Sequence, residues 1–83
     1  MDVIVEFTES AFRHGISEAD IRHALKTRIY AAMMQEFPEK YGVIGFDRAG
    51  NPLEVMYNPV DDDHILIFHA MKLRESFKRQ LEL

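Results

Sequence analysis

The chain has no cysteine and no tryptophan, and its 83 residues include only four glycines and three prolines. Without cysteine, it can form neither disulfide bonds nor thiolate metal sites, which fits a reducing compartment. No apolar run approaches the ~20 residues that a membrane span requires. The first residues also lack the basic and apolar regions of a signal peptide. We therefore expect a cytoplasmic protein that binds no membrane, no metal and no other cofactor.

Apolar residues make up 47% of the chain, which predicts a packed core within one domain spanning residues 1–83. The net charge of −4 argues against a general nucleic-acid-binding surface. The basic residues are unevenly distributed, however. Four of the ten lie close together near the C-terminal end: Lys72, Arg74, Lys78 and Arg79. Such a segment is typical of either a solvated helix face or a binding surface.

Three strand-like segments follow one another in the second half of the chain. They are Tyr41–Phe46, Leu53–Asn58 and His64–His69. The second alternates apolar and polar side chains, as in a half-buried strand. The third is apolar on both faces, as in a central strand. The turns between them, Asp47–Pro52 and Asn58–Asp63, are short, and short connections force an antiparallel meander.

Two glycines, Gly42 and Gly45, lie inside the first of these strands. Glycine weakens a strand because it has no side chain to pack, so its presence there needs a reason. The pattern predicts either a bulge or a place where another backbone approaches closely.

The first half of the chain predicts a strand and two helices. Residues Asp2–Phe7 alternate as a short strand does. A short helix should follow over Glu9–His14, with Thr8 as its N-cap and Gly15 just beyond its end.

A second helix is predicted over Ser17–Lys26, with Ser17 as its N-cap. Its apolar residues recur at helical spacing, so one side of the helix should lie on the sheet. We expect the two helices to cover one sheet face through Phe12, Ile21 and Leu25.

Two further segments complete the expected architecture. Residues near Ile29–Met34 have mixed propensities, and we interpret them as an edge strand. A terminal helix should run from about Ala70 to Leu81. The expected fold is therefore α+β, in the order β-α-α-β-β-β-α, with one antiparallel sheet and helices packed on it.

The chain resembles the BrnT-like toxins of the RelE/ParE superfamily. BrnT-like proteins carry Lys-His-Gly-Val/Ile-Ser between the first two helices, and Arg13–Ser17 reads Arg-His-Gly-Ile-Ser. They also carry Ile-Ser-Ala-Arg-Lys-Ala where a strand meets a charged helix, and Phe68–Leu73 occupies that place. The similarity in order and spacing covers almost the whole chain.

The resemblance implies the toxin of a type II toxin–antitoxin pair, with metal-independent ribonuclease activity. The 2′-hydroxyl of RNA would attack the adjacent phosphate, so the substrate supplies the nucleophile. The implied partner is a small antitoxin, of the ribbon-helix-helix DNA-binding type, and a homodimer is possible. The implied catalytic residues are Lys72, His69, Arg74 and His14. The implied RNA-binding residues are Arg13, Lys78 and Arg79.

One position departs from the family pattern, because Met71 stands where the family has arginine. Either Lys72 or Arg74 takes the phosphate-binding role, or the activity is weaker or lost. The alternative functions are a catalytically silent interaction module and a ParE-like inhibitor that acts by protein contact. Convergence of the basic residues on one concave patch would favour catalysis, whereas scattering would favour binding.

Overall fold

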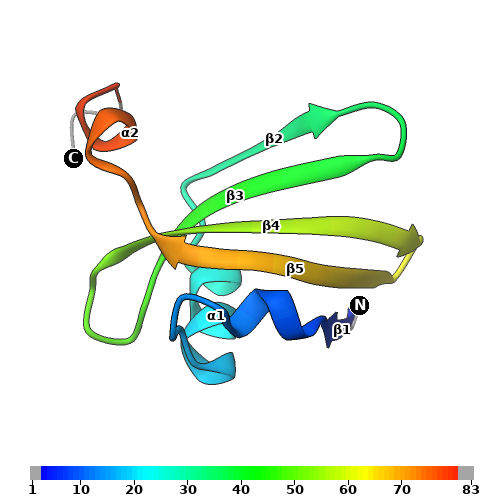
Figure 1. Cartoon of the computed structure of the whole chain (residues 1–83), viewed down its shortest axis with the longest axis horizontal. Helices are drawn as coiled ribbons and strands as arrows, with labels where there is room; N and C mark the ends of the chain where they lie inside the picture. Colours follow the sequence, from blue (N-terminus) through cyan, green and yellow to red (C-terminus); the bar gives the residue numbers. More distant parts are fainter. Residues whose placement is uncertain (1–2, 81–83) are drawn as a thin grey trace.

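A computed structural model describes residues 3–80 of the chain. Within this range the protein is a small α+β domain whose five-stranded sheet has the order β1-β5-β4-β3-β2 (Figure 1). The strands are β1 (Ile4–Phe7), β2 (Tyr30–Gln35), β3 (Lys40–Phe46), β4 (Pro52–Asp61) and β5 (His64–Lys72). The helices are the 3₁₀ helix η1 (Glu9–Phe12), α1 (Glu18–Lys26) and α2 (Glu75–Gln80). The predicted α+β class is confirmed.

The predicted antiparallel meander forms the centre of the sheet. β3 pairs antiparallel with β4, and β4 pairs antiparallel with β5. The predicted edge strand is also confirmed, because β2 lies at the end of the sheet and pairs with β3. A bulge between Met33 and Gln35 interrupts this last pairing.

The prediction of a wholly antiparallel sheet is wrong, because β1 pairs in parallel with β5. The pairing sets Ile4 opposite His64 and Phe7 opposite Ile67. The alternation of a four-residue strand indicates which side chains are buried, but not which strand it joins or in which direction. The sheet is therefore mixed, with β5 between a parallel and an antiparallel neighbour.

The predicted start of the terminal helix is also wrong. β5 continues to Lys72 and α2 begins at Glu75, while the predicted end at Leu81 lies outside the described residues. Ala70 pairs with Val55 and is fully buried, so cross-strand packing overrides the helix propensity of this segment. None of the described helices has the length and apolar character that crossing a membrane would require.

The turn predicted at Asn58–Asp63 is shorter than expected, because β4 continues to Asp61. Pro59 lies within the strand, opposite Ile65 of β5. The pairing of β4 with β3 stops at Tyr57, so Pro59 has a neighbouring strand on one side only. A missing N–H is tolerated at such an edge position.

The first predicted helix, Glu9–His14, is replaced by the single turn η1. The Thr8 hydroxyl bonds to the Ser10 hydroxyl at 2.7 Å and, within the described residues, makes no capping bond to a backbone N–H. The Ser17 cap of α1 is confirmed, because its hydroxyl accepts a hydrogen bond from the N–H of Asp20 at 3.2 Å. These contacts fix where the chain leaves the sheet and where α1 begins.

The core lies between the sheet and the two helical elements η1 and α1. Its buried residues are Ala11, Ile21, Ala24, Leu53, Val55, Ile67 and Ala70. Ile21 is fully buried and Leu25 packs against the core, as predicted. The prediction is wrong for Phe12, which is exposed and stacks on Phe7 with ring centroids 5.3 Å apart.

α1 packs so closely on β3 that one position admits no side chain. A Cβ atom on Gly45 would overlap the backbone carbonyl of Ala24. Of the two predicted reasons for this glycine, a bulge or a close backbone approach, the second is confirmed. α1 therefore covers one sheet face, and we call the opposite face, which carries Ile44, Glu54 and Met56, the open face.

Gly45→Ala should destabilise the protein by about 1–3 kcal/mol, because the added methyl group displaces the α1 backbone. The matched control is Gly42→Ala in the same strand, where the new methyl group would meet only the flexible Met34 side chain. Urea denaturation followed by circular dichroism measures both variants. Equal midpoints for the two variants would contradict the close helix–strand contact.

A polar contact links α1 to the turn between β3 and β4. The Arg48 side chain and backbone N–H donate hydrogen bonds to Asp20 Oδ1 at 2.8 and 3.0 Å. The side-chain hydrogen bond from Arg48 is the main cause that lowers the pKa of Asp20 below its ordinary value of 3.8. The ionised carboxylate is therefore favoured in the folded state.

This contact predicts a pH dependence. A carboxylate whose pKa is lower in the folded state stabilises the protein above about pH 4, and the stabilisation is lost as the pH falls through the lowered pKa. Asp20→Asn should therefore lower the urea midpoint at neutral pH and differ less from the parent near pH 2. Asp62→Asn, in the exposed β4–β5 turn, removes the same charge as a control. A deficit of Asp20→Asn that is unchanged in acid would refute the contact.

Candidate functional site

A buried carboxylate lies on the open face of the sheet. Glu54 belongs to β4, and its residue surface is only 5% exposed. Its neighbours across the sheet are Ile44 of β3 and Met71 of β5. A carboxylate in such apolar surroundings must be paired to offset its desolvation.

Two basic side chains supply the pairing. Arg74 Nε donates to Glu54 Oε1 at 3.1 Å, and Arg74 Nη2 donates to Oε2 at 3.3 Å. His69 Nε2 lies 3.2 Å from Glu54 Oε2. Because an ionised carboxylate only accepts hydrogen bonds, Nε2 of His69 carries the proton in this contact. The lone pair of the neutral imidazole is therefore on Nδ1.

A second imidazole lies beside the first. His14 follows η1, and its ring meets that of His69 edge to face, with centroids 5.5 Å apart and an interplanar angle of 73°. Gly15 follows with a φ of +80°, a conformation that favours glycine and turns the chain towards α1. We call Glu54, His69, Arg74 and His14 the Glu54 cluster.

The structure brings together three of the residues that the family resemblance selects: His14, His69 and Arg74. Lys72 is exposed, and strand alternation directs it to the same side as the buried Ala70, opposite to His69. Within residues 3–80, Lys72 makes no hydrogen bond or ion pair with the Glu54 cluster.

The remaining basic candidates lie apart from these contacts. Lys78 pairs with Glu75 of its own helix at 3.3 Å. Arg13 and Arg79 are exposed side chains, the first after η1 and the second in α2. These three residues remain predictions for RNA binding.

Sequence reasoning missed Glu54, which alternates with Leu53 and Val55 and reads as an ordinary solvent-facing position. The available signal was an acidic residue in a strand that the meander places between two others. Its importance depends on Met71 opposite it and on Arg74 just beyond β5. Neither contact can be predicted without the correct end of β5.

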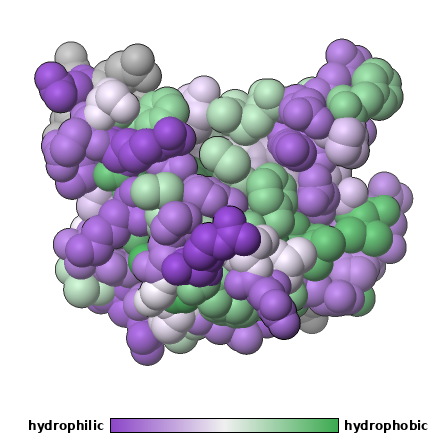
Figure 2. Space-filling model, viewed as in Figure 1, coloured by the Kyte–Doolittle hydropathy of each residue, from purple (hydrophilic) through white to green (hydrophobic). Residues whose placement is uncertain are grey.

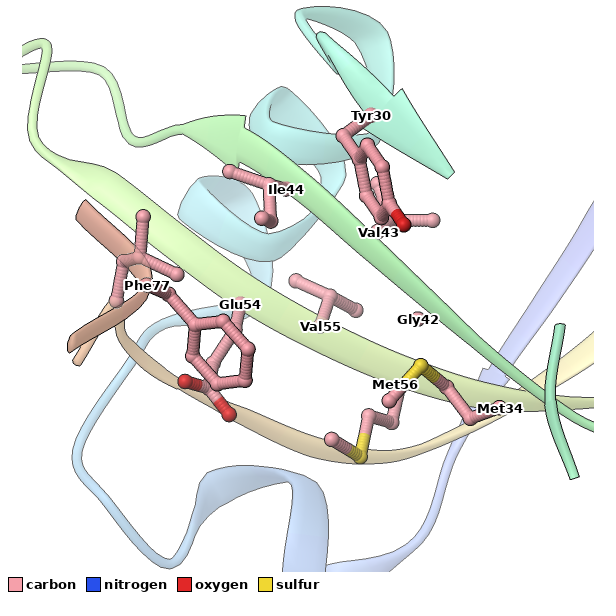
Figure 3. A pocket seen from close by; sticks show the side chains of 10 residues that line it. Tyr30, Met34, Gly42, Val43, Ile44, Glu54, Val55, Met56 and Phe77 are labelled. Atoms are coloured by element: carbon pink, nitrogen blue, oxygen red, sulfur yellow. The ribbon is translucent and has the colours of Figure 1, made fainter. Parts of the chain in front are cut away.

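A pocket of about 180 Å³ opens next to Glu54 on the open face (Figure 3). Residues from β2, β3, β4 and α2 line it, including Tyr30, Met34, Ile44, Met56 and Phe77. The space-filling view shows the surface hollowed between α2 and the β2–β3 hairpin (Figure 2). Glu54 is thus both the centre of a charged cluster and part of an apolar pocket wall.

The Phe77 ring helps to hold Arg74 in place. The Arg74 guanidinium carbon lies 4.9 Å from the centroid of this ring, a cation–π distance. α2 therefore contributes one wall of the pocket and supports the cation that pairs with Glu54.

No protein-family model matches this chain, and no curated protein matches it.

Arg74→Ala should destabilise the protein by about 1–3 kcal/mol, because it leaves a buried carboxylate with His69 as its remaining partner. Replacing the carboxylate as well, in the double variant Glu54→Met with Arg74→Ala, should recover part of this loss. Thermal unfolding of the parent, both single variants and the double variant measures the coupling. Additive losses in the double variant would contradict a direct pairing.

Proposed function

We propose that this protein is a metal-independent endoribonuclease and the toxin of a toxin–antitoxin pair. The observation that carries the proposal is the Glu54 cluster, in which His69 and Arg74 contact a buried carboxylate and the ring of His14 lies against that of His69. RNA cleavage through the 2′-hydroxyl needs a base, an acid and a cation, and these side chains supply such groups.

His69 is the proposed general base. Its Nε2 proton points to Glu54, so the lone pair on Nδ1 is free to accept the proton of the 2′-hydroxyl. The carboxylate would stabilise the imidazolium that forms, as the aspartate does for the histidine of a Ser-His-Asp triad. The Glu54–His69 contact therefore gives the base both its orientation and its electrostatic support.

His14 is the proposed general acid and Arg74 the proposed phosphate-binding cation. The 2′-oxygen forms a bond to phosphorus while the bond from phosphorus to the 5′-oxygen breaks. His69 takes the 2′-hydroxyl proton, and protonated His14 gives a proton to the leaving 5′-oxygen. Of the five N–H donors of a guanidinium, Glu54 uses two, which leaves three for a phosphate. The products are a 2′,3′-cyclic phosphate and a free 5′-hydroxyl.

A second candidate function is a catalytically silent interaction module of the same fold. The observation in its favour is that Glu54 already neutralises Arg74 within a chain of net charge −4. A neutralised cation attracts phosphate less strongly than a free one. In this case the Glu54 cluster would be structural, and the apolar pocket would contact a protein partner.

The partner implied by the toxin proposal is a small DNA-binding antitoxin. The open face supports such a partner, because a domain of this size would otherwise leave an apolar pocket beside its basic groups uncovered.

His69→Ala should reduce RNA cleavage by about 10²–10⁴-fold, because it removes the proposed base. Lys72→Ala should cost less, since strand alternation directs Lys72 away from the Glu54 cluster. The matched control is Arg22→Ala, which removes an exposed cation paired with Glu18 on α1. The measurement is the rate at which purified protein produces fragments that end in 2′,3′-cyclic phosphate.

Two outcomes would redirect the proposal. Equal losses in His69→Ala and Arg22→Ala would place the chemistry elsewhere. A folded, antitoxin-free parent that neither cleaves RNA nor arrests growth when induced would favour the interaction module.

A further inference from the structure

The pocket on the open face carries two aromatic rings. Tyr30 of β2 and Phe77 of α2 both line it, and Figure 3 shows their rings on opposite sides of the pocket. Ile44, Met34 and Met56 belong to the apolar part of its wall. Proteins that bind single-stranded RNA hold unstacked bases against aromatic side chains in this way. The lining of the pocket therefore fits a nucleobase.

The size of the pocket distinguishes between the two kinds of base. Its volume is about 180 Å³, and an apolar cavity of about 150 Å³ binds one benzene molecule. A pyrimidine is a single six-membered ring, as benzene is, whereas a purine carries a second, fused ring. The pocket therefore has room for a pyrimidine but not for a whole purine.

Glu54 gives this apolar wall a hydrogen-bond acceptor. Among residues 3–80, Glu54 Oε2 contacts both His69 and Arg74, whereas Oε1 accepts a hydrogen bond from Arg74 alone. A carboxylate oxygen can accept two hydrogen bonds, so Oε1 has one lone pair left. Both RNA pyrimidines carry a matching donor, because cytosine has an amino group and uracil has a ring N–H.

The pocket is also close to the proposed general base. Met56 of the pocket wall is the partner of His69 in the pairing of β4 with β5, and paired strands lie about 4.8 Å apart. Glu54 likewise belongs to the pocket wall and contacts His69. A single nucleotide can therefore place its base in the pocket and its ribose beside His69.

We propose that this pocket binds the pyrimidine base of the nucleotide whose 2′-hydroxyl attacks, so that cleavage follows a pyrimidine. The base lies between Tyr30 and Phe77, with its N–H donor directed to Glu54. The inference rests on the proposed function for the position of the phosphate. It adds a base specificity that the groups of the Glu54 cluster do not supply by themselves.

Nucleosides test the pocket separately from catalysis, because they carry no phosphate to cleave. Cytidine and uridine should each shift the methyl NMR signals of Met34 and Met56 with one dissociation constant. Adenosine and guanosine should bind at least about tenfold more weakly, because their second ring overpacks the pocket. The internal control is Met33, which lies outside the pocket and is exposed to a similar extent as Met34, 51% against 54%.

Tyr30→Ala should weaken the binding of cytidine by about tenfold, because it removes one of the two stacking rings. The matched control is Phe37→Ala, which removes a ring that is 83% exposed and lies outside the pocket. Circular dichroism checks that both variants are folded. An unchanged affinity in Tyr30→Ala, an equal loss in Phe37→Ala, or purine nucleosides that bind as tightly as pyrimidine nucleosides would overturn the proposal.

The failure of this proposal and the failure of the proposed function are separate results. A protein that binds pyrimidine nucleosides at Met34 and Met56 but cuts no RNA would support the base pocket and contradict the ribonuclease. A protein that cuts RNA equally after all four nucleosides, with both methionine signals unshifted, would overturn the base pocket alone.

Discussion

The contact between Glu54 and its two basic partners determines how the open face is organised. It links β4 to the end of β5 through His69, and to the start of α2 through Arg74. A buried carboxylate without hydrogen-bonding partners destabilises the folded state. The fold is therefore most stable when His69 and Arg74 stay in contact with Glu54. The same contact places the proton of His69 on Nε2 and leaves Nδ1 outside the contact with Glu54.

α1 leaves the open face uncovered because this helix packs on the other side of the sheet. Gly45 allows the backbone of Ala24 to approach β3 directly, and Ile21 fills the adjacent core. η1 is held to β5 by the Ser10 hydroxyl, which donates to the Phe68 carbonyl at 2.7 Å. His14, just after η1, is thereby brought to the ring of His69. One residue of the Glu54 cluster, His14, therefore comes from the side of the sheet that carries η1 and α1.

The meander, the edge strand and the close approach at Gly45 could be predicted because each depends on local pattern and short connections. The parallel pairing of β1 could not, since four alternating residues specify no neighbour. The start of α2 was misplaced because Ala70 has helix propensity but is held in β5 by cross-strand packing. The resemblance selected His69 and Arg74, but the role of Glu54 follows only from strand register.

We propose that His14, His69 and Arg74 together form one phosphate-binding site. It is tested most directly by titrating the folded protein with uridine 3′-monophosphate, an unreactive product analogue, while recording the imidazole signals by NMR. We predict that the signals of His14 and His69 shift with one common dissociation constant. The internal controls, His23 at the Phe46 carbonyl and His64 beside Glu6, should stay unchanged. Shifts confined to the control histidines, or an unchanged His14–His69 pair at saturating nucleotide, would contradict the account.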